Sequence, residues 1–487
     1  MTASTEYHPA LTERWFDAAP DAASGLVSTC AEAGPLSASD ADALPAPPTP
    51  RRATVRNALR FARREGDVVF ADAARCGDVL TYDLPGAPGR LVVISDPAHV
   101  RSVLTADPAI APSATRLSPL RPIVGPDSVL TTLAEQHRRQ RTALLPSFHR
   151  TSVARCTDVI EQASAAHLDR WPTNRRVRVD RIAQAITLDV IMAVIFGIHA
   201  ADGILTDDVP DVATTAERHL RDATRRFLRW SSSAVGTVAQ LLNASHPEPV
   251  GLLAWGVRHL DAAIAGVIAE RRADGHASDD DVMSALLAAR ATDGLPLSDS
   301  EIRDELVSLL LAGHETTATT IAWAFERLTR HPEVYAQARS AAAEGDDEFV
   351  GAVITETMRC RPVVPSVARE LQRPWRFGTH RCESGDIAVV STLLLHHRDD
   401  LYPHPFDFRP DRFIGTRTDP MTLLPFGGGN RRCLGAHLAM TELQIVVGDI
   451  LRRVELETHD RPAERPRYRN VTMIPARGGT VRALSVD

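Results

Sequence analysis

The sequence has 487 residues, of which 44% are hydrophobic and 24% are charged, and its formal net charge is −7. This length alone suggests more than one domain, although a large enzyme can be built around one extended core. The composition is that of a folded protein, and the mildly acidic balance argues against a nucleic-acid-binding protein, which needs a strongly basic surface.

The first fifty residues differ in composition from the rest of the chain. Residues 1–50 are rich in Ala, Ser, Asp and Pro, and we expect them to form a mobile or loosely packed leader. The N-terminus lacks a basic start followed by an apolar run, so no signal peptide is predicted. No stretch reaches about 18 consecutive apolar residues, which argues against a membrane-spanning helix. We expect a cytoplasmic protein.

Helix and strand patterns alternate after this leader. Residues 55–66 have helical periodicity, and three short runs are typical of strands: 67–73, 78–84 and 90–95. A further helix is predicted to begin near Pro97, with Ser95 or Asp96 as its cap.

Residues 150–345 are dominated by helical periodicity, which includes a long run from Ser298 to Arg330. Another helix is predicted from about Asp347 to Cys360. Strand character returns only in short pieces, at 386–395 and 480–486. The sequence therefore predicts a mainly α fold with a minor β portion toward both ends, and argues against a barrel or a doubly wound sheet.

The cysteines indicate where to look for chemistry. Six are scattered along the chain without a CxxC pair: Cys30, Cys76, Cys156, Cys360, Cys382 and Cys433. This pattern favours neither structural zinc nor a disulfide framework. Free thiols in a reducing compartment explain five of them.

Cys433 stands in an unusual segment, Phe426-Gly-Gly-Gly-Asn-Arg431-Arg-Cys433-Leu-Gly435. Glycines let the backbone turn with positive φ and approach a flat cofactor closely. A helix is predicted just after the cysteine, and the positive end of its dipole favours an anionic sulfur. One alternative is an ordinary buried cysteine in a glycine-rich turn, but the whole string fits a ligand loop better.

This string resembles the cysteine-ligand loop of the cytochrome P450 family, F-x-x-G-x-R-x-C-x-G, at every fixed position. The resemblance extends from about Arg51 to Val486 and implies one catalytic domain over residues 51–487. It implies the family's triangular helical prism, with haem b between a long distal helix and the proximal cysteine loop and helix. Cys433 would be the iron ligand, and Phe426 and Gly427 would lie against the haem.

Glu356 and Arg359 lie three residues apart on a predicted helix and can therefore pair. An isolated pair of this kind is usually a solvated surface contact. The later segment Phe408-Arg-Pro-Asp-Arg412-Phe resembles the family's P-E-R-F segment, with Asp411 in place of the glutamate. The resemblance implies a buried, structural triad of Glu356, Arg359 and Arg412.

The long predicted helix carries polar residues in its middle, Ala312-Gly-His314-Glu315-Thr316. A zinc-protease helix would read H-E-x-x-H, and here Ala318 replaces the second histidine, so His314 is not expected to be a ligand. A hydroxyl that competes for a backbone carbonyl, next to glycine, predicts a local kink or groove. A role in helix packing alone is the alternative.

The resemblance assigns the roles in this segment. Glu315 and Thr316 would be the acid–alcohol pair: Thr316 would hydrogen-bond the dioxygen under reduction, and Glu315 would belong to the proton relay. Ala312 would lie against the haem. The family's propionate contacts match four cations, each of which could otherwise be a solvated charge: His137, Arg141, Arg369 and Arg431.

We expect electrons to come from separate proteins, because only about fifty residues follow Cys433 and no flavin domain fits there. We expect a ferredoxin and its reductase, fed by NAD(P)H, with Arg138, Arg139 and Arg432 either as a positive docking face or as ordinary surface charges. We expect a monomer without nucleic-acid partners.

The substrate is the least constrained part of the prediction. By family analogy the pocket is lined by residues 108–131, 225–255, 310–311, 363–367 and 471–474, which are mainly aliphatic. They predict an apolar substrate, such as a lipid, terpenoid, steroid or polyketide-like molecule, and a place in secondary metabolism. A row of arginines at helical spacing would form a solvated face, steer an acidic substrate or touch a membrane: Arg218, Arg221, Arg225, Arg226 and Arg229.

The alternative function is a haem-thiolate enzyme that uses peroxide, or one that catalyses desaturation or coupling instead of hydroxylation. A peroxide-driven enzyme would typically lack the Glu315–Thr316 pair, so the presence of this pair favours reductive activation of oxygen.

Overall fold

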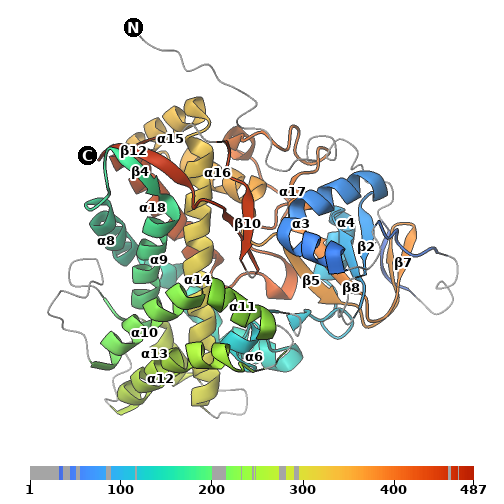
Figure 1. Cartoon of the computed structure of the whole chain (residues 1–487), viewed down its shortest axis with the longest axis horizontal. Coiled ribbons are helices and arrows are strands. Elements are labelled where there is room, and N and C mark those ends of the chain that lie inside the picture. The colour runs from blue at the N-terminus through green and yellow to red at the C-terminus, as the bar shows by residue number, and fades with distance from the viewer. Residues whose placement is uncertain are drawn as a thin grey trace, which may run out of the picture.

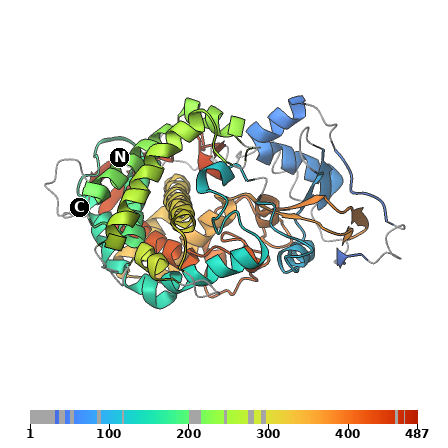
Figure 2. The same cartoon turned by 90° about the horizontal axis from the view of Figure 1, so that it is seen from below.

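The computed structural model describes residues 32–36, 44–50, 55–83, 89–115, 118–199, 215–231, 233–243, 246, 248–273, 281–289, 296–458, 462–469 and 471–486. A helix-rich part and a strand-containing part lie side by side (Figure 1). The longest helix, α14 (Asp299–Leu328), runs through the middle of the helix-rich part, and Figure 2 shows it end-on among its neighbours.

The remaining helices are α3 (Val55–Cys76), α4 (Pro97–Leu104), α5 (Arg121–Val124), α6 (Ala134–Leu144), α7 (Arg150–Ala154), α8 (Thr157–Leu168), α9 (Val179–Phe196), α10 (Thr215–Ser231), α11 (Ala234–Asn243), α12 (Leu252–Ala273), α13 (Val282–Ala288), α15 (Pro332–Glu344), α16 (Asp347–Cys360), α17 (Thr392–His396) and α18 (Ala436–Arg453). Short 3₁₀ turns are η2 (Leu145–Phe148), η3 (Pro410–Phe413) and η4 (Gly429–Arg431).

The strands are β1 (Ala33–Pro35), β2 (Val79–Tyr82), β3 (Leu91–Ile94), β4 (Arg175–Arg178), β5 (Ser366–Glu370), β6 (Trp375–Phe377), β7 (His380–Cys382), β8 (Ile387–Ser391), β9 (Val454–Glu457), β10 (Pro466–Arg469), β11 (Thr472–Pro475) and β12 (Thr480–Val486). They form sheets in the orders β2-β3-β8-β5, β1-β6-β7 and β4-β12-β9, together with the hairpin β10-β11. β3 and β8 are parallel, with Leu91 opposite Ile387, whereas the other pairs are antiparallel.

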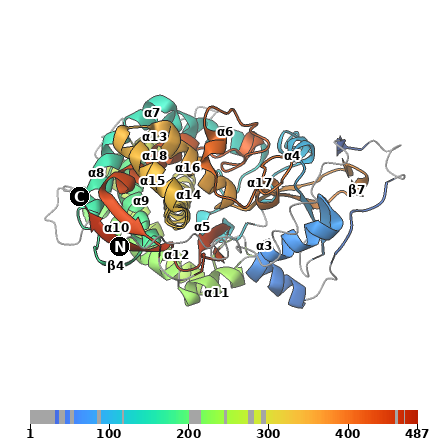
Figure 3. The same cartoon turned by 90° about the horizontal axis from the view of Figure 1, so that it is seen from above.

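α14 forms because its start is capped and its length is buried. The Ser298 side chain accepts the Glu301 N–H, and the Glu301 carboxylate accepts the Ser298 N–H at 2.9 Å. This reciprocal cap satisfies two backbone donors that would otherwise lack partners. Apolar residues along the helix, such as Leu306, Ile321 and Phe325, are buried against the surrounding helices. The same core extends to α16 and α18, which lie beside α14 in Figure 3.

Several predicted elements are confirmed with small shifts. The long helix, the helix over Asp347–Cys360 and the strand over 480–486 are present. The Asp96 side chain caps α4 by accepting the N–H groups of Ala98 and His99, so Asp96 is the cap rather than Ser95.

Two strand predictions need correction. Residues 67–73 continue α3 as helix. Val68, Val69 and Phe70 are consecutive and all buried, whereas a half-buried strand would expose every second residue. A short apolar run of this kind does not distinguish a strand from a buried helix. The predicted strand at 386–395 is a strand only to Ser391, where the Ser391 hydroxyl caps α17 by accepting the Leu394 N–H.

Only parts of the predicted leader lie within the described residues. β1 pairs with β6, and the Pro48 carbonyl accepts the Thr81 N–H at 2.9 Å. These stretches are therefore bonded to the body of the protein, whereas residues 1–31, 37–43 and 51–54 lie outside the described part. The division of the chain at residue 50 stays a prediction.

Among the described helices, α12 alone is long and apolar enough to cross a membrane by length and composition, and 33% of its most apolar window is buried inside the protein. One such helix is weak evidence for a membrane span, because a core helix passes the same test. Leu253, Val257 and Leu260 of α12 are buried in the core.

Candidate functional site: a cysteine loop, a cation cluster and a polar helix segment

The loop before Cys433 is closed by two backbone hydrogen bonds. The Cys433 N–H donates to the Phe426 carbonyl at 2.8 Å, and the Gly427 N–H donates to the Leu424 carbonyl at 3.0 Å. Gly427 and Gly429 have φ angles of +65° and +66°. A Cβ at Gly429 would lie 1.8 Å from the Leu104 carbonyl oxygen. Glycine is therefore required at position 429 both by its conformation and by the close approach of α4.

The sulfur of Cys433 accepts a backbone hydrogen bond from Gly435, which caps the start of α18. Burial raises the pKa of the Cys433 thiol, and this outweighs the lowering by the Gly435 N–H, Arg141 and Arg432. The residue nevertheless has exposed surface. The Cys433 residue is therefore accessible at the surface of this structure although protein atoms surround its thiol. A metal ion bound there would displace the proton and leave the thiolate.

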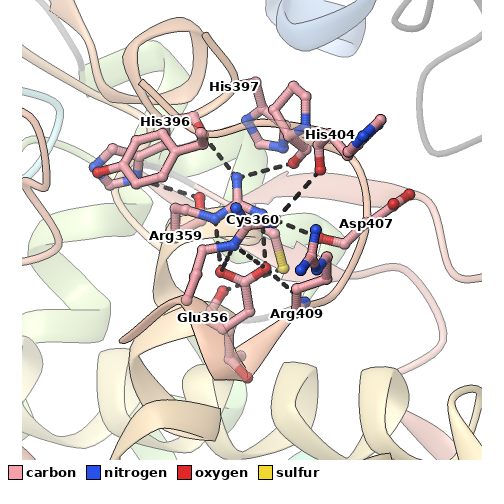
Figure 4. A network of polar contacts seen from close by, with 12 residues as sticks. Glu356, Arg359, Cys360, His396, His397, His404, Asp407 and Arg409 are labelled. Carbon is pink, nitrogen blue, oxygen red and sulfur yellow. Dashed lines mark hydrogen bonds and ion pairs between the residues drawn. The ribbon is translucent and has the colours of Figure 1, made fainter. Parts of the chain in front are cut away.

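A buried ion pair holds the segment that leads to this loop. The Arg359 Nε and Nη2 atoms donate to the two Glu356 carboxylate oxygens at 2.7 and 2.8 Å, and both residues are fully buried. The remaining Arg359 donor, Nη1, binds the carbonyls of His396 and Pro405 (Figure 4). The Arg412 Nε lies 3.3 Å from Glu356, so the predicted triad is formed. The Arg409 N–H makes a shorter bond to Glu356, at 2.8 Å.

His396 is a part of the scaffold that the sequence did not reveal. Its Nε2 accepts the Leu424 N–H at 2.8 Å, and its Nδ1 lies 3.2 Å from the Arg359 carbonyl. Burial, reinforced by Arg359, lowers the pKa of His396 to about 3, so the ring is neutral. The accepting Nε2 places the proton on Nδ1, which donates to Arg359. His396 thereby connects the Glu356–Arg359 pair to the start of the cysteine loop.

The four cations predicted to hold an anion come together from three parts of the chain. His137 and Arg141 lie on α6, Arg369 on β5 and Arg431 in the cysteine loop. Burial and the charges of the three arginines lower the pKa of His137 to about 4. Burial also lowers the pKa of Arg369 to about 10, and burial with Arg369 and Arg141 lowers that of Arg431 to about 10.

This cation cluster (His137, Arg141, Arg369 and Arg431) has no counter-charge of its own. Within the described part of the chain, none of its arginines forms an ion pair with a carboxylate. Arg431 donates instead to the carbonyls of Val129, at 2.8 Å, and Thr132. Cations that are largely buried without a counter-charge are costly, so the cluster fits a ligand that carries carboxylates.

The middle of α14 exposes a short polar face. Ala312 is exposed and Glu315 and Thr316 are partly exposed, although residues on either side of them along α14 are buried. The Thr316 hydroxyl donates to the Ala312 carbonyl at 2.7 Å. The expected competition for a carbonyl is therefore present, but α14 continues as a helix through this segment. Gly313 has a packing role, because a Cβ there would lie 2.5 Å from Ile191 Cδ1 of α9.

The hairpin β10-β11 supplies the partners of Glu315. Its carboxylate accepts from Arg469 Nη1 at 3.0 Å and from the Thr472 hydroxyl at 3.3 Å. Burial raises the pKa of Glu315, although both partners oppose this rise. His314 points the other way: its Nε2 lies 3.1 Å from the Gln184 carbonyl on α9, and burial lowers its pKa to about 4. This position agrees with the expectation that His314 is not a ligand.

The predicted docking arginines are not equivalent. Arg138 pairs with Glu135, and Arg139 pairs with Glu301. Arg432 is exposed and makes no ion pair with any described residue. Of the five arginines on α10, Arg218, Arg226 and Arg229 are exposed, whereas Arg221 is buried.

Three features together fit a haem-binding enzyme. They are the mainly helical fold, the glycine loop that ends in an accessible cysteine, and a group of buried and half-buried cations that have no carboxylate partner among the described residues. A sequence model of the cytochrome P450 family matches residues 45–481. Cytochrome P450 135B1 of Mycobacterium tuberculosis is 37% identical over 443 residues, which cover 90% of this chain and 91% of that protein. Cytochrome P450 137 of the same species is 36% identical over 433 residues, with coverages of 88% and 85%. Both names are provisional.

A solved structure, retinoic acid bound cyanobacterial CYP120A1, covers 91% of this chain with a TM-score of 0.74 and 21% identity, which shows the shared fold. The chain belongs to the cytochrome P450 family. It is therefore a haem-iron oxidoreductase of the monooxygenase class, and the predicted family, fold and enzyme class are confirmed. The roles of individual residues stay predictions.

Proposed function

We propose that this chain inserts one oxygen atom from O₂ into an apolar organic substrate, such as a lipid, terpenoid, steroid or polyketide-like molecule. The supporting observation is the polar face of α14, where the partly exposed Glu315 and Thr316 lie beside the exposed Ala312, between stretches of the helix that are mostly buried. Burying polar groups in the middle of a helix is costly unless they are hydrogen-bonded. Leu310 and Leu311 precede them, and Met473 and Ile474 lie on β11, so the predicted lining is aliphatic.

Bound haem supplies the chemistry that reduces O₂ and cleaves its O–O bond. In this proposal the Cys433 sulfur would hold the haem iron, and the Gly435 N–H, which donates to this sulfur, would reduce the negative charge on it. The cation cluster holds the propionate carboxylates. Parts of the haem pocket would be formed by Phe426, Gly427 and Ala312.

Protons are handled by the two polar residues of α14. The raised pKa of Glu315 lets its carboxyl group carry a proton closer to neutral pH than a solvated glutamate does. Arg469 and Thr472 keep this carboxyl group in place. While the Thr316 hydroxyl donates to the Ala312 carbonyl, its oxygen can accept a hydrogen bond from the exposed face, and it can donate to a ligand there only by giving up the Ala312 carbonyl.

Electrons are proposed to come from NAD(P)H through a ferredoxin reductase and a ferredoxin. Arg432, next to Cys433 and without an ion-pair partner among the described residues, is the best placed docking cation. Arg138 and Arg139 already have acidic partners, so they contribute less positive potential than the sequence suggested.

The assignment of Cys433 is tested by replacing it with serine. The reduced, CO-treated wild type should show the strongly red-shifted Soret band of a thiolate-ligated haem. The variant Cys433→Ser should lose that band, whereas Cys76→Ser, at a half-buried cysteine at the end of α3, should keep it. A band that survives in Cys433→Ser rules out this cysteine as the ligand.

The role of Thr316 is tested by coupling. Apolar probes, among them the retinoic acid that the solved neighbour binds, are first screened for a spin-state shift. With a probe that shifts, Thr316→Ala should divert most of the electrons from product to peroxide and water. Thr320→Ala is the control, because its hydroxyl makes the same bond one turn later, to the Thr316 carbonyl at 3.0 Å. If the two variants couple the same share of electrons to product formation, Thr316 has no part in the mechanism. Full turnover of the wild type with hydrogen peroxide alone favours the peroxide-driven alternative.

A further inference from the structure

We propose that Glu305 is a positioning residue for the cation cluster. It holds Val129, and Val129 in turn holds the Arg431 side chain. The proposal rests on the proposed function insofar as it takes the cation cluster to be the site of the haem carboxylates. Glu305 lies on α14, three turns before Thr316, and is almost fully buried.

Val129 is bonded on both sides. Its N–H donates to the Glu305 Oε1 at 3.0 Å, and its carbonyl accepts from the Arg431 Nη1 at 2.8 Å. One peptide segment thus connects α14 with the cysteine loop. A shift of Val129 is transmitted directly to the guanidinium group of Arg431.

The segment around Val129, residues 125–132, is docked on one face of α14. The Asp304 carboxylate accepts the Asp127 N–H at 2.9 Å, and the Ser128 and Ser308 hydroxyls lie 2.5 Å apart. Gly125 has a φ of +87°, and a Cβ there would collide with the Asp304 carboxylate at 2.1 Å. The sequence therefore permits a contact between loop and helix that any other residue at position 125 would obstruct.

α6 holds the same segment from the other side. Gln140 donates to the Asp127 carbonyl and accepts from the Thr132 hydroxyl at 2.5 Å. The Thr132 carbonyl is the second acceptor of Arg431. Both acceptors of Arg431 thus belong to a segment fixed by α14 and α6, and Glu305 makes the bond nearest to the first of them.

Glu305 is suited to hold a neutral N–H group without adding a charge. Its Oε2 is buried and has no hydrogen-bond partner among the described residues. Burial, together with the carboxylates of Asp304 and Asp127, raises the pKa of Glu305 to about 8 even though the Val129 N–H opposes this. The group is therefore a neutral acid at pH 7, and glutamine is its closest substitute in shape and charge.

The experiment measures the release of haem from the ferric holoenzyme to excess apomyoglobin at pH 7. Glu305→Ala leaves the Val129 N–H without its acceptor, and we expect release to be roughly five- to tenfold faster, as for one lost buried hydrogen bond. Glu305→Gln keeps an acceptor at the same place and should restore the wild-type rate. Ser308→Ala, on the same face of α14, removes a bond to the segment without touching Val129 and should change the rate less than twofold.

A double variant separates this route from general loosening. Arg431→Leu should speed release by itself, and adding Glu305→Ala to it should have no further effect if Glu305 acts through Arg431. Additive effects, or equal effects of Ser308→Ala and Glu305→Ala, overturn the proposal. If Arg431→Leu does not change the release rate, the assignment of the cation cluster to the haem carboxylates fails. This outcome tests the proposed function, whereas the other outcomes test only the role of Glu305.

Discussion

Glu356→Gln should destabilise the whole protein, because it breaks a charge pair that is completely buried. The Glu356 carboxylate receives two bonds from Arg359, one from the Arg409 N–H and a longer one from Arg412. The amide of glutamine offers one acceptor oxygen in place of two and turns an NH₂ group toward the arginine. The Arg359 charge then remains buried with only carbonyl groups and the face of Tyr402, 5.2 Å away, around it.

Removal of one partner of a buried ion pair typically costs about 3–5 kcal/mol. We expect the free energy of unfolding to fall by about that amount, and the haem content of the purified protein to fall with it, because the same network leads through His396 to the cysteine loop. The measurement is urea unfolding followed by circular dichroism, with the slope compared between variants.

Glu135→Gln is the matched control, since Glu135 forms an i,i+3 pair with Arg138 of the same chemistry on the exposed surface of α6. That variant should leave the unfolding midpoint unchanged, as exposed pairs contribute little. A loss below about 1 kcal/mol in Glu356→Gln would show that the pair is not the structural centre of this region.

Two further predictions concern the cysteine loop and the helix behind it. Gly429→Ala should abolish haem incorporation, whereas Gly266→Ala, on α12 where a Cβ would meet nothing within 4 Å, should leave it intact. Soret absorbance per mole of protein measures the haem content of both variants. Normal haem content in Gly429→Ala would contradict the close approach of Leu104. Glu442 on α18 is buried with an unpartnered Oε1, and burial raises its pKa to about 8. The folded state therefore binds a proton more tightly than the unfolded state, so this group stabilises the fold at low pH and loses its contribution as pH rises from about 4.5 through 8. Glu442→Gln should flatten the decline of the urea midpoint between pH 5 and pH 8, and an unchanged decline would assign it to other groups.

The sequence by itself determined the features that depend on neighbouring residues. The glycine turn and Cys433 lie within ten residues of each other, and Glu356 and Arg359 lie on one helix face by spacing alone. The same holds for Glu315, Thr316 and the Ala312 carbonyl four residues earlier. Such contacts follow from local backbone geometry, so motif and periodicity were enough to predict them.

Tertiary structure decided whatever joins distant segments. The run at 67–73 is helix, and most of its residues are buried, among them the consecutive Val68, Val69 and Phe70, which no local pattern expresses. His396 and Glu305 have no motif, and their functions come from backbone groups of Leu424 and Val129 that only the folded chain brings within reach. Burial acts in the same way, since it raises the pKa of Cys433 against the helix start that the sequence suggested would lower it. Desolvation depends on the atoms packed around a group, and those atoms come from all parts of the chain.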